Sequence, residues 1–271
     1  GGYFGGRLAQ AGEDVTFIAR GQHLAAITEA GLQVDSIEGD FLVKPAKATD
    51  STESIGTVDV VILSVKAWQL GESLSQIHPL IKKETIILPL LNGVDHIDTL
   101  LNEFGAEHVL GGLCRISSFA IAPGHIQHVA IQPYIAFGEL DNRKSARADT
   151  LHQIFIRLSG LVVEVPANIE LAIWKKFLFI CAFSGVGAVT RQPVGFFRSV
   201  PETRIMFRRA LEEVVAVASA RGIALTQASV QSVIDRMDAT QPDTMASMQK
   251  DIVEGRPSEL ESQTGALVRM G

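Results

Sequence analysis

One run of residues limits the possible folds more than any other feature of this sequence. Residues 58–65 read Val-Asp-Val-Val-Ile-Leu-Ser-Val, an almost continuous series of apolar and β-branched side chains. Such a series is typical of a strand buried on both faces, as in a parallel sheet covered by helices. Further strand-like stretches at 15–19, 41–48 and 85–91 alternate with helical stretches at 21–30, 67–81 and 94–104. This alternation predicts an α/β domain with a doubly wound parallel sheet.

The pattern changes twice along the rest of the chain. Short alternating runs between about residues 111 and 165, separated by turn residues, predict antiparallel strands added to the sheet. After Pro166 we expect helices over residues 169–190, 201–221, 227–238, 244–254 and 258–270. The sequence therefore predicts two domains, a Rossmann-like dinucleotide-binding domain at 1–166 and an all-α helical domain at 167–271.

Composition excludes several classes of protein. Hydrophobic residues make up 46% and charged residues 20% of the 271 residues, which is the composition of a globular domain and not of a disordered chain. The formal net charge of −6 comes without a basic stripe, so we expect no nucleic-acid partner. No uninterrupted apolar run reaches the roughly 18 to 20 residues of a membrane span. The two cysteines lie far apart, and we expect a reduced, cytoplasmic protein.

The chain opens on Gly-Gly-Tyr-Phe-Gly-Gly, followed by a helical stretch at 7–12. A dinucleotide-binding domain begins with a strand and a G-x-G-x-x-G turn whose main-chain N–H groups hold the pyrophosphate at a helix N-terminus. We interpret Gly1 as the last glycine of such a turn, with the first strand missing. The helical pattern still continues at Gly271, so both ends are expected to be cut.

Polar residues follow three of the expected strands. Arg20 stands about 20 residues after the glycines, where an acid would contact the ribose of NAD and an arginine the 2′-phosphate of NADP, so NADP is favoured. Lys66 and Asn92 follow the next two strands. Because ligands of open α/β sheets bind beyond the carboxyl ends of the strands, we expect both residues at one crevice.

Two adjacent lysines interrupt an otherwise apolar helix. Lys175 and Lys176 lie in a stretch that is hydrophobic on nearly all faces, and two neighbouring lysines about 100° apart cannot easily share one exit to solvent. One of them is therefore expected to face a cleft. A spacing of four residues places Lys176, Ile180 and Ser184 along one stripe.

A metal site is not expected. His125 and His128 have the spacing of a ligand pair, but they fall in a strand-like stretch with no third ligand nearby.

Together these motifs resemble the ketopantoate reductase (2-dehydropantoate 2-reductase) family over essentially the whole chain. The resemblance rests on the glycine opening, Ala-Arg-Gly at 19–21, Val-Lys-Ala-Trp-Gln at 65–69, Leu-Asn-Gly at 91–93, Trp-Lys-Lys at 174–176, Ser247 and Ser258-Glu259. It implies that NADPH reduces the 2-keto group of ketopantoate to the hydroxyl of pantoate, on the way to pantothenate and coenzyme A. The resemblance is compatible with a homodimer.

The resemblance also implies residue roles. Lys176 would be the general acid, with Glu259 beside it in catalysis. The residues that would contact the cofactor NADP(H) are Gly1, Gly2, Arg20, Lys66, Asn92, Ser117 and Glu259. The residues that would contact the 2-keto acid substrate are Asn92, Lys176, Ile180, Ser184 and Ser247.

One departure keeps alternatives open. Asparagines that commonly follow the family's lysine at plus four and plus eight are Ile180 and Ser184 here, and isoleucine cannot form a hydrogen bond. A reductase of another 2-keto acid is therefore one alternative. A noncatalytic NADP-binding sensor of the same fold is a second alternative, and the combination of Lys176, Asn92 and Glu259 argues against it. An NAD-dependent hydroxyacid dehydrogenase is a third, disfavoured by Arg20.

Overall fold

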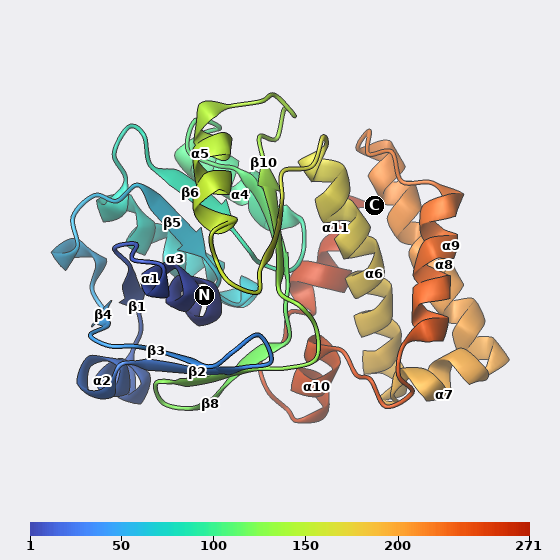
Figure 1. Cartoon of the computed structure of the whole chain (residues 1–271). Helices are drawn as coiled ribbons and strands as arrows, with labels where there is room; N and C mark the ends of the chain where they lie inside the picture. Colours follow the sequence, from blue (N-terminus) through green and yellow to red (C-terminus); the bar gives the residue numbers. More distant parts are fainter. The chain divides into compact units, whose positions relative to one another are not determined.

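The computed structural model describes residues 1–271 and divides them into two compact units (Figure 1). The first, the strand unit, comprises Gly1–Val65, Leu70–Leu91 and Leu100–Ile169. The second, the helical unit, comprises Lys66–Gln69, Asn92–Thr99 and Glu170–Gly271. Two short stretches from the first half of the sequence therefore belong to the helical unit.

The strand unit holds every strand of the chain. These are β1 (Thr16–Ile18), β2 (Leu32–Ser36), β3 (Phe41–Val43), β4 (Lys47–Thr49), β5 (Val60–Leu63), β6 (Ile86–Pro89), β7 (Gly111–Arg115), β8 (Ser118–Ala122), β9 (His125–His128), β10 (Tyr134–Gly138) and β11 (Val162–Glu164). Its helices are α1 (Gly2–Gln10), α2 (Gly21–Ala30), α3 (Leu70–Ile77) and α5 (Ala146–Phe155), with short 3₁₀ turns η1 (Thr52–Ser54) and η3 (His78–Leu80).

The strands form small sheets rather than one continuous sheet. β1 pairs with β4 and β5 with β6, both in parallel. A four-stranded sheet has the order β3-β2-β9-β8, and a three-stranded sheet has the order β11-β10-β7. In these two sheets the pairs β2–β9 and β10–β11 are parallel, whereas β3, β8 and β7 pair antiparallel with their neighbours. The extension over residues 111–165 is therefore mixed, not purely antiparallel as expected.

The prediction of a single strand over residues 41–48 was wrong, because the structure has two strands there. β3 pairs with β2 and β4 pairs with β1, and Pro45 lies between them. Proline has no N–H to donate to a strand ladder, so pairing stops there. The strands β2 and β7 and the helix α5 were not expected at all. β7 begins with two glycines, which have low strand propensity, but a side chain on Gly112 would collide with the main-chain oxygen of Pro89 in β6.

The opening glycines are already helical, although the helix was expected to begin at Arg7. α1 starts at Gly2 and packs against β2, β3 and β9. A Cβ on Gly5 would lie 2.8 Å from Phe17, one on Gly6 would lie 2.8 Å from Phe41, and one on Gly2 would collide with Ile126. These glycines therefore serve the close approach of the helix to the strands.

The helical unit contains η2 (Ala67–Gln69), α6 (Ile169–Thr190), α7 (Val194–Ser199), α8 (Pro201–Ala220), α9 (Gln227–Ala239), α10 (Ser247–Val253), the π-helical turn η4 (Glu261–Gly265) and α11 (Ala266–Met270). α4 (Asp95–Phe104) begins in this unit and ends in the strand unit, and Ile169, the first residue of α6, belongs to the strand unit. α7 was not expected, and the helix expected over residues 258–270 is divided into η4 and α11.

α6 is the central apolar helix of its unit. Phe183 at its middle packs edge-on against Phe197 of α7, which in turn contacts Phe207 of α8. α6 is long and apolar enough to cross a membrane, judged by length and composition alone, but 56% of that window is buried inside the protein. Phe177 and Leu178 are only 1% and 0% exposed, as is typical of a helix in the core of a protein.

Candidate active site

A buried carboxylate in the helical unit connects three separate stretches of chain. Glu259 is only 3% exposed. Its Oε1 accepts a hydrogen bond from the main-chain N–H of Ala67 at 3.3 Å, and its Oε2 accepts one from Nδ2 of Asn92 at 3.1 Å. Both oxygens therefore have partners, as a buried carboxylate requires. Three of the predicted site residues, Glu259, Asn92 and Lys66, are thereby brought close together, since Lys66 precedes Ala67.

Lys66 is held by a second acid of the same unit. Its Nζ lies 3.1 Å from Oδ2 of Asp251 on α10, and Arg256 donates to Oδ1 of Asp251 from Nε at 3.0 Å and from NH2 at 2.8 Å. Burial tends to raise the pKa of Asp251, but the hydrogen bonds and charges of Arg256 and Lys66 outweigh it and leave that pKa below its usual value. Asp251 is an ion-paired anion that fixes Lys66.

The two adjacent lysines of α6 have different environments. Lys175 is exposed, whereas Lys176 is half-buried between the buried residues Trp174 and Phe177. The two lysines thus differ in exposure, and the prediction that one of them faces a cleft stays a prediction.

His96 is a residue of this site that sequence reasoning missed. It lies in the first turn of α4, four residues after Asn92, and is 2% exposed. Burial, and secondly the charge of Lys176, lower the pKa of His96 to about 3. The sequence signal was a histidine at a helix start directly after a strand-end Asn-Gly.

The other predicted substrate contacts occupy varied positions. Ile180 is half-buried and Ser184 is buried at 4% exposure, one and two turns after Lys176 on α6. Ser247 is exposed and is the first residue of α10. The helical unit thus contains all of the substrate contacts that the resemblance implies.

The remaining predicted cofactor contacts belong to the strand unit. Gly1 is the N-cap of α1 and no side chain caps this end, so the first N–H groups of the helix remain without helical acceptors. A Cβ on Gly1 would lie 3.4 Å from Cβ of Ser64, whose buried Oγ has no hydrogen-bond partner. An unpaired hydroxyl beside an uncapped helix N-terminus fits the phosphate groups of a dinucleotide. Ser64, directly after β5, is a second residue that sequence reasoning missed.

Arg20 and Ser117 complete this group. Arg20 follows β1, is exposed, and its NH1 forms an ion pair of 2.8 Å with Oε1 of Glu72. An exposed guanidinium after β1 fits a nucleotide 2′-phosphate. Ser117 is half-buried between β7 and β8, and its main-chain oxygen accepts from Val129.

Two other features of the strand unit do not form a reactive site. His125 pairs with Asp35 at 2.8 Å and His128 with Ser36 at 2.8 Å, and no group of three or more His, Cys, Asp or Glu side chains in the chain is arranged to hold a metal ion.

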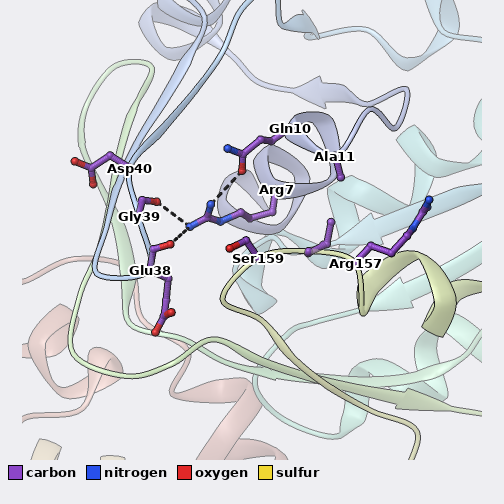
Figure 2. A pocket seen from close by; sticks show the side chains of 9 residues that line it. Arg7, Gln10, Ala11, Glu38, Gly39, Asp40, Arg157 and Ser159 are labelled. Carbon is purple, nitrogen blue, oxygen red and sulfur yellow. Dashed lines mark hydrogen bonds between the residues drawn. The ribbon is translucent and has the colours of Figure 1, made fainter.

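A pocket of about 380 Å³ lies beside α1 (Figure 2). Figure 2 shows that Arg7 points at the main-chain oxygens of Glu38 and Gly39, to which it donates at 3.0 and 2.8 Å. This guanidinium already donates to acceptors within the protein, so we do not assign the pocket a ligand. None of the predicted site residues lines it.

An α/β unit with an uncapped helix N-terminus and an arginine after β1, together with a helical unit that carries a half-buried lysine, is the combination expected of an NADP-dependent oxidoreductase. Comparison with known proteins gives the family. The model of "Ketopantoate reductase PanE/ApbA" matches residues 1–142, and that of "Ketopantoate reductase PanE/ApbA C terminal" matches residues 168–271. The chain belongs to the ketopantoate reductase family.

Individual relatives agree. The chain is 31% identical to the uncharacterized oxidoreductase YkpB of Bacillus subtilis (strain 168), over 99% of this chain and 88% of that protein. A solved 2-dehydropantoate 2-reductase from Geobacter metallireducens GS-15 is 31% identical, with a TM-score of 0.89 over 99% of this chain and 90% of that one. A D-mandelate dehydrogenase solved with NADH and anilino(oxo)acetate is 25% identical, with a TM-score of 0.87 over 99% and 87% of the two chains. The predicted fold class and the prediction of an NADP-dependent oxidoreductase are confirmed.

Proposed function

We propose that this chain uses NADPH to reduce 2-dehydropantoate to pantoate, with Lys176 as the general acid. One set of residues in the helical unit supports the proposal. Lys176 is half-buried on α6, and Asn92, which precedes α4, donates to the buried carboxylate of Glu259. The unit thus holds a half-buried ammonium together with an amide and a buried carboxylate that are bonded to each other.

The chemistry follows from these groups. When bound, NADPH supplies a hydride to C2 of the keto acid, and negative charge develops on the keto oxygen. The Lys176 ammonium stabilises that charge more in the transition state than in the ground state and then transfers its proton to the oxygen. Asn92 orients the reacting groups by hydrogen bonding, and Glu259 holds Asn92. Gly1, Gly2, Arg20, Ser117 and Lys66 bind the cofactor, and Ser184 and Ser247 bind the substrate.

The first test compares the two neighbouring lysines of α6. Lys176→Ala should lower kcat by about 10²- to 10⁴-fold, the usual contribution of general acid catalysis, with little change in the Kd of NADPH. Lys175→Ala is the matched control, because this exposed lysine should leave kcat nearly unchanged. Equal effects of the two substitutions would contradict the assignment of the acid.

A second candidate is a reductase of a different 2-keto acid. It is favoured by Ile180, which is half-buried one turn after Lys176 and presents no polar atom to a substrate hydroxyl. Loss of nicotinamide absorbance with a panel of 2-keto acids decides between the two. The first candidate requires the highest kcat/KM for 2-dehydropantoate, and the second requires it for an acid whose side chain is apolar. No turnover of any 2-keto acid would leave the noncatalytic NADP-binding sensor.

A further inference from the structure

The proposed cofactor contact Arg20 is paired with an acid that the sequence motifs did not predict. In the strand unit, NH1 of Arg20 lies 2.8 Å from Oε1 of Glu72, which stands in the first turn of α3. In dinucleotide-binding folds an acid at this place accepts a hydrogen bond from the ribose 2′-hydroxyl of NAD, whereas an arginine binds the 2′-phosphate of NADP. This chain brings both kinds of residue to one place.

Strand pairing explains how Glu72 reaches Arg20. β1 and β4 are parallel, and their pairing extends past β1, because the N–H of Ala19 donates to the main-chain oxygen of Thr49 at 3.0 Å. The turn η1 follows β4 and packs against α3. The start of α3 thus lies beside the carboxyl end of β1, the kind of edge at which open α/β sheets bind their ligands.

The main chain at Arg20 adds donors for an anion. Arg20 is the N-cap of α2 in an extended conformation, and Gly21 has a φ of +54°, so the chain turns sharply into the helix. No side chain caps this end of α2, and its first N–H groups therefore have no helical acceptors. Together with the guanidinium they suit a phosphate group. The arginine side of the pair thus favours NADPH.

The acid side of the pair has the opposite preference. The side chains of Arg20 and Glu72 are 51% and 60% exposed, and an ion pair with this exposure contributes little to stability. Only Oε1 of Glu72 takes part in the pair, so Oε2 remains an acceptor without a partner in the protein. A carboxylate accepts a hydrogen bond from a hydroxyl group but repels a phosphate. Glu72 therefore favours a ribose with a free 2′-hydroxyl, as in NADH.

We propose that Glu72 is a specificity-determining residue of the cofactor site: its unpaired carboxylate oxygen accepts a hydrogen bond from the 2′-hydroxyl of NADH, so that the chain binds NADH in addition to NADPH. With NADPH, the 2′-phosphate takes donors of Arg20, and the neighbouring carboxylate weakens that attraction. The preference for NADPH is therefore smaller than the arginine alone would give. The inference rests on the proposed function, because it takes Arg20 to contact the cofactor ribose.

Calorimetric titration of Glu72 variants with NADH and NADPH, without substrate, tests the inference. Glu72→Ala removes the acceptor and the charge, so the Kd of NADH should rise about tenfold and that of NADPH should fall about threefold. Glu72→Gln keeps an acceptor oxygen, so the Kd of NADH should rise no more than about threefold. Asp59→Ala is the matched control and should change neither Kd. Asp59 is an exposed acid that also pairs with a base, Lys82, but it lies at the start of β5 and not beyond the end of a strand.

A cofactor analogue isolates the 2′-hydroxyl itself. NADH whose adenosine ribose lacks this hydroxyl should bind the unaltered protein about tenfold more weakly than NADH does, whereas Glu72→Ala should bind the two equally well. An equal loss in both proteins, or a Glu72→Ala variant that binds both NADH and NADPH more weakly, would overturn the inference. If neither cofactor binds the unaltered protein, the proposed function fails together with the inference. If both bind and only the expectations for Glu72 fail, the proposed function is unaffected.

Discussion

Single residues in the helical unit connect stretches that are distant in sequence. Glu259 binds main chain at Ala67 and a side chain at Asn92, and Asp251 binds Lys66. In each case an acid from the last quarter of the chain fixes a residue that follows a strand in the first third. Removal of either acid leaves a buried or partly buried partner without its hydrogen bond, which costs more than the bond itself contributes.

Arg20 leads to a prediction about cofactor choice. Arg20→Ala should weaken NADPH binding at least about tenfold and leave NADH binding nearly unchanged, because only NADPH carries the 2′-phosphate. Glu72→Gln removes the ion-pair partner but keeps the guanidinium, so it should retain the preference for NADPH. Titration of both cofactors by fluorescence measures the two ratios. Equal weakening of both cofactors by Arg20→Ala would assign this arginine another role.

The pKa of Asp251 leads to a prediction about stability. Since the folded pKa lies below the unfolded one, the stabilisation by this ion pair is complete above the unfolded pKa of about 3.9 and is lost as the pH falls through the folded pKa. Asp251→Asn should therefore lower the free energy of unfolding by about 1–3 kcal/mol near neutral pH and by progressively less as the pH falls below the unfolded pKa. Urea unfolding at a neutral and at an acid pH measures this.

An exposed ion pair provides the control for Asp251. Asp141 and Arg143 are each 63% exposed, so Asp141→Asn should change the unfolding free energy by less than about 1 kcal/mol. A loss in Asp251→Asn that is the same at both pH values would show that the charge of Asp251 is not what stabilises the fold.

Among the secondary-structure elements, α6 offers two glycines two residues apart with opposite environments. A Cβ on Gly187 would collide with Oε1 of Gln249, which is 0% exposed and donates from Nε2 to the main-chain oxygen of Gln192 at 2.8 Å. A Cβ on Gly185 would make an ordinary contact of 3.5 Å with Thr264. Gly187 therefore permits α10, which carries Asp251, to pack against α6.

For Gly185 and Gly187 we expect substitution by alanine to have opposite effects on stability. Gly185→Ala should stabilise the protein by roughly 0.5–1 kcal/mol through helix propensity. Gly187→Ala should destabilise it by about 1–3 kcal/mol, because the buried glutamine has no room to move. Chemical denaturation of both variants measures the difference. A stabilising Gly187→Ala would mean that α10 adjusts freely.

The elements also show what the sequence could predict. α2 and α6 have the predicted bounds, because each has a clear apolar pattern and a distinct start and end. The division of 41–48 and the strand β7 could not be predicted, because they depend on which strands lie next to Pro45 and Gly112. In the candidate site, Lys66, Asn92 and Glu259 were predicted from motifs, and the structure brings them close together. His96 and Ser64 were not, because their lack of partners is a property of packing and not of sequence.

For the whole molecule, ligand linkage gives a prediction that needs no knowledge of the substrate. A ligand that binds only the folded chain at about 100 times its Kd adds roughly 2.7 kcal/mol of stability, which should raise the Tm by several degrees. NADP⁺ should therefore raise the Tm more than NAD⁺ at the same concentration, as measured by calorimetry. Equal shifts for the two cofactors would contradict the preference for NADP. The domain boundary near residue 166 stays a prediction.

Each unit is assembled from separate segments of the chain, and this limits how the protein can be divided or recombined. The chain passes from one unit to the other after residues 65, 69, 91, 99 and 169. A gene segment encoding only residues 167–271 would therefore lack Lys66, Asn92 and His96, and no single cut yields a complete helical unit. Exchange of carboxyl-terminal halves between relatives should produce inactive hybrids unless residues 66–69 and 92–99 are exchanged with them, so these two stretches and the helical unit are expected to be inherited together.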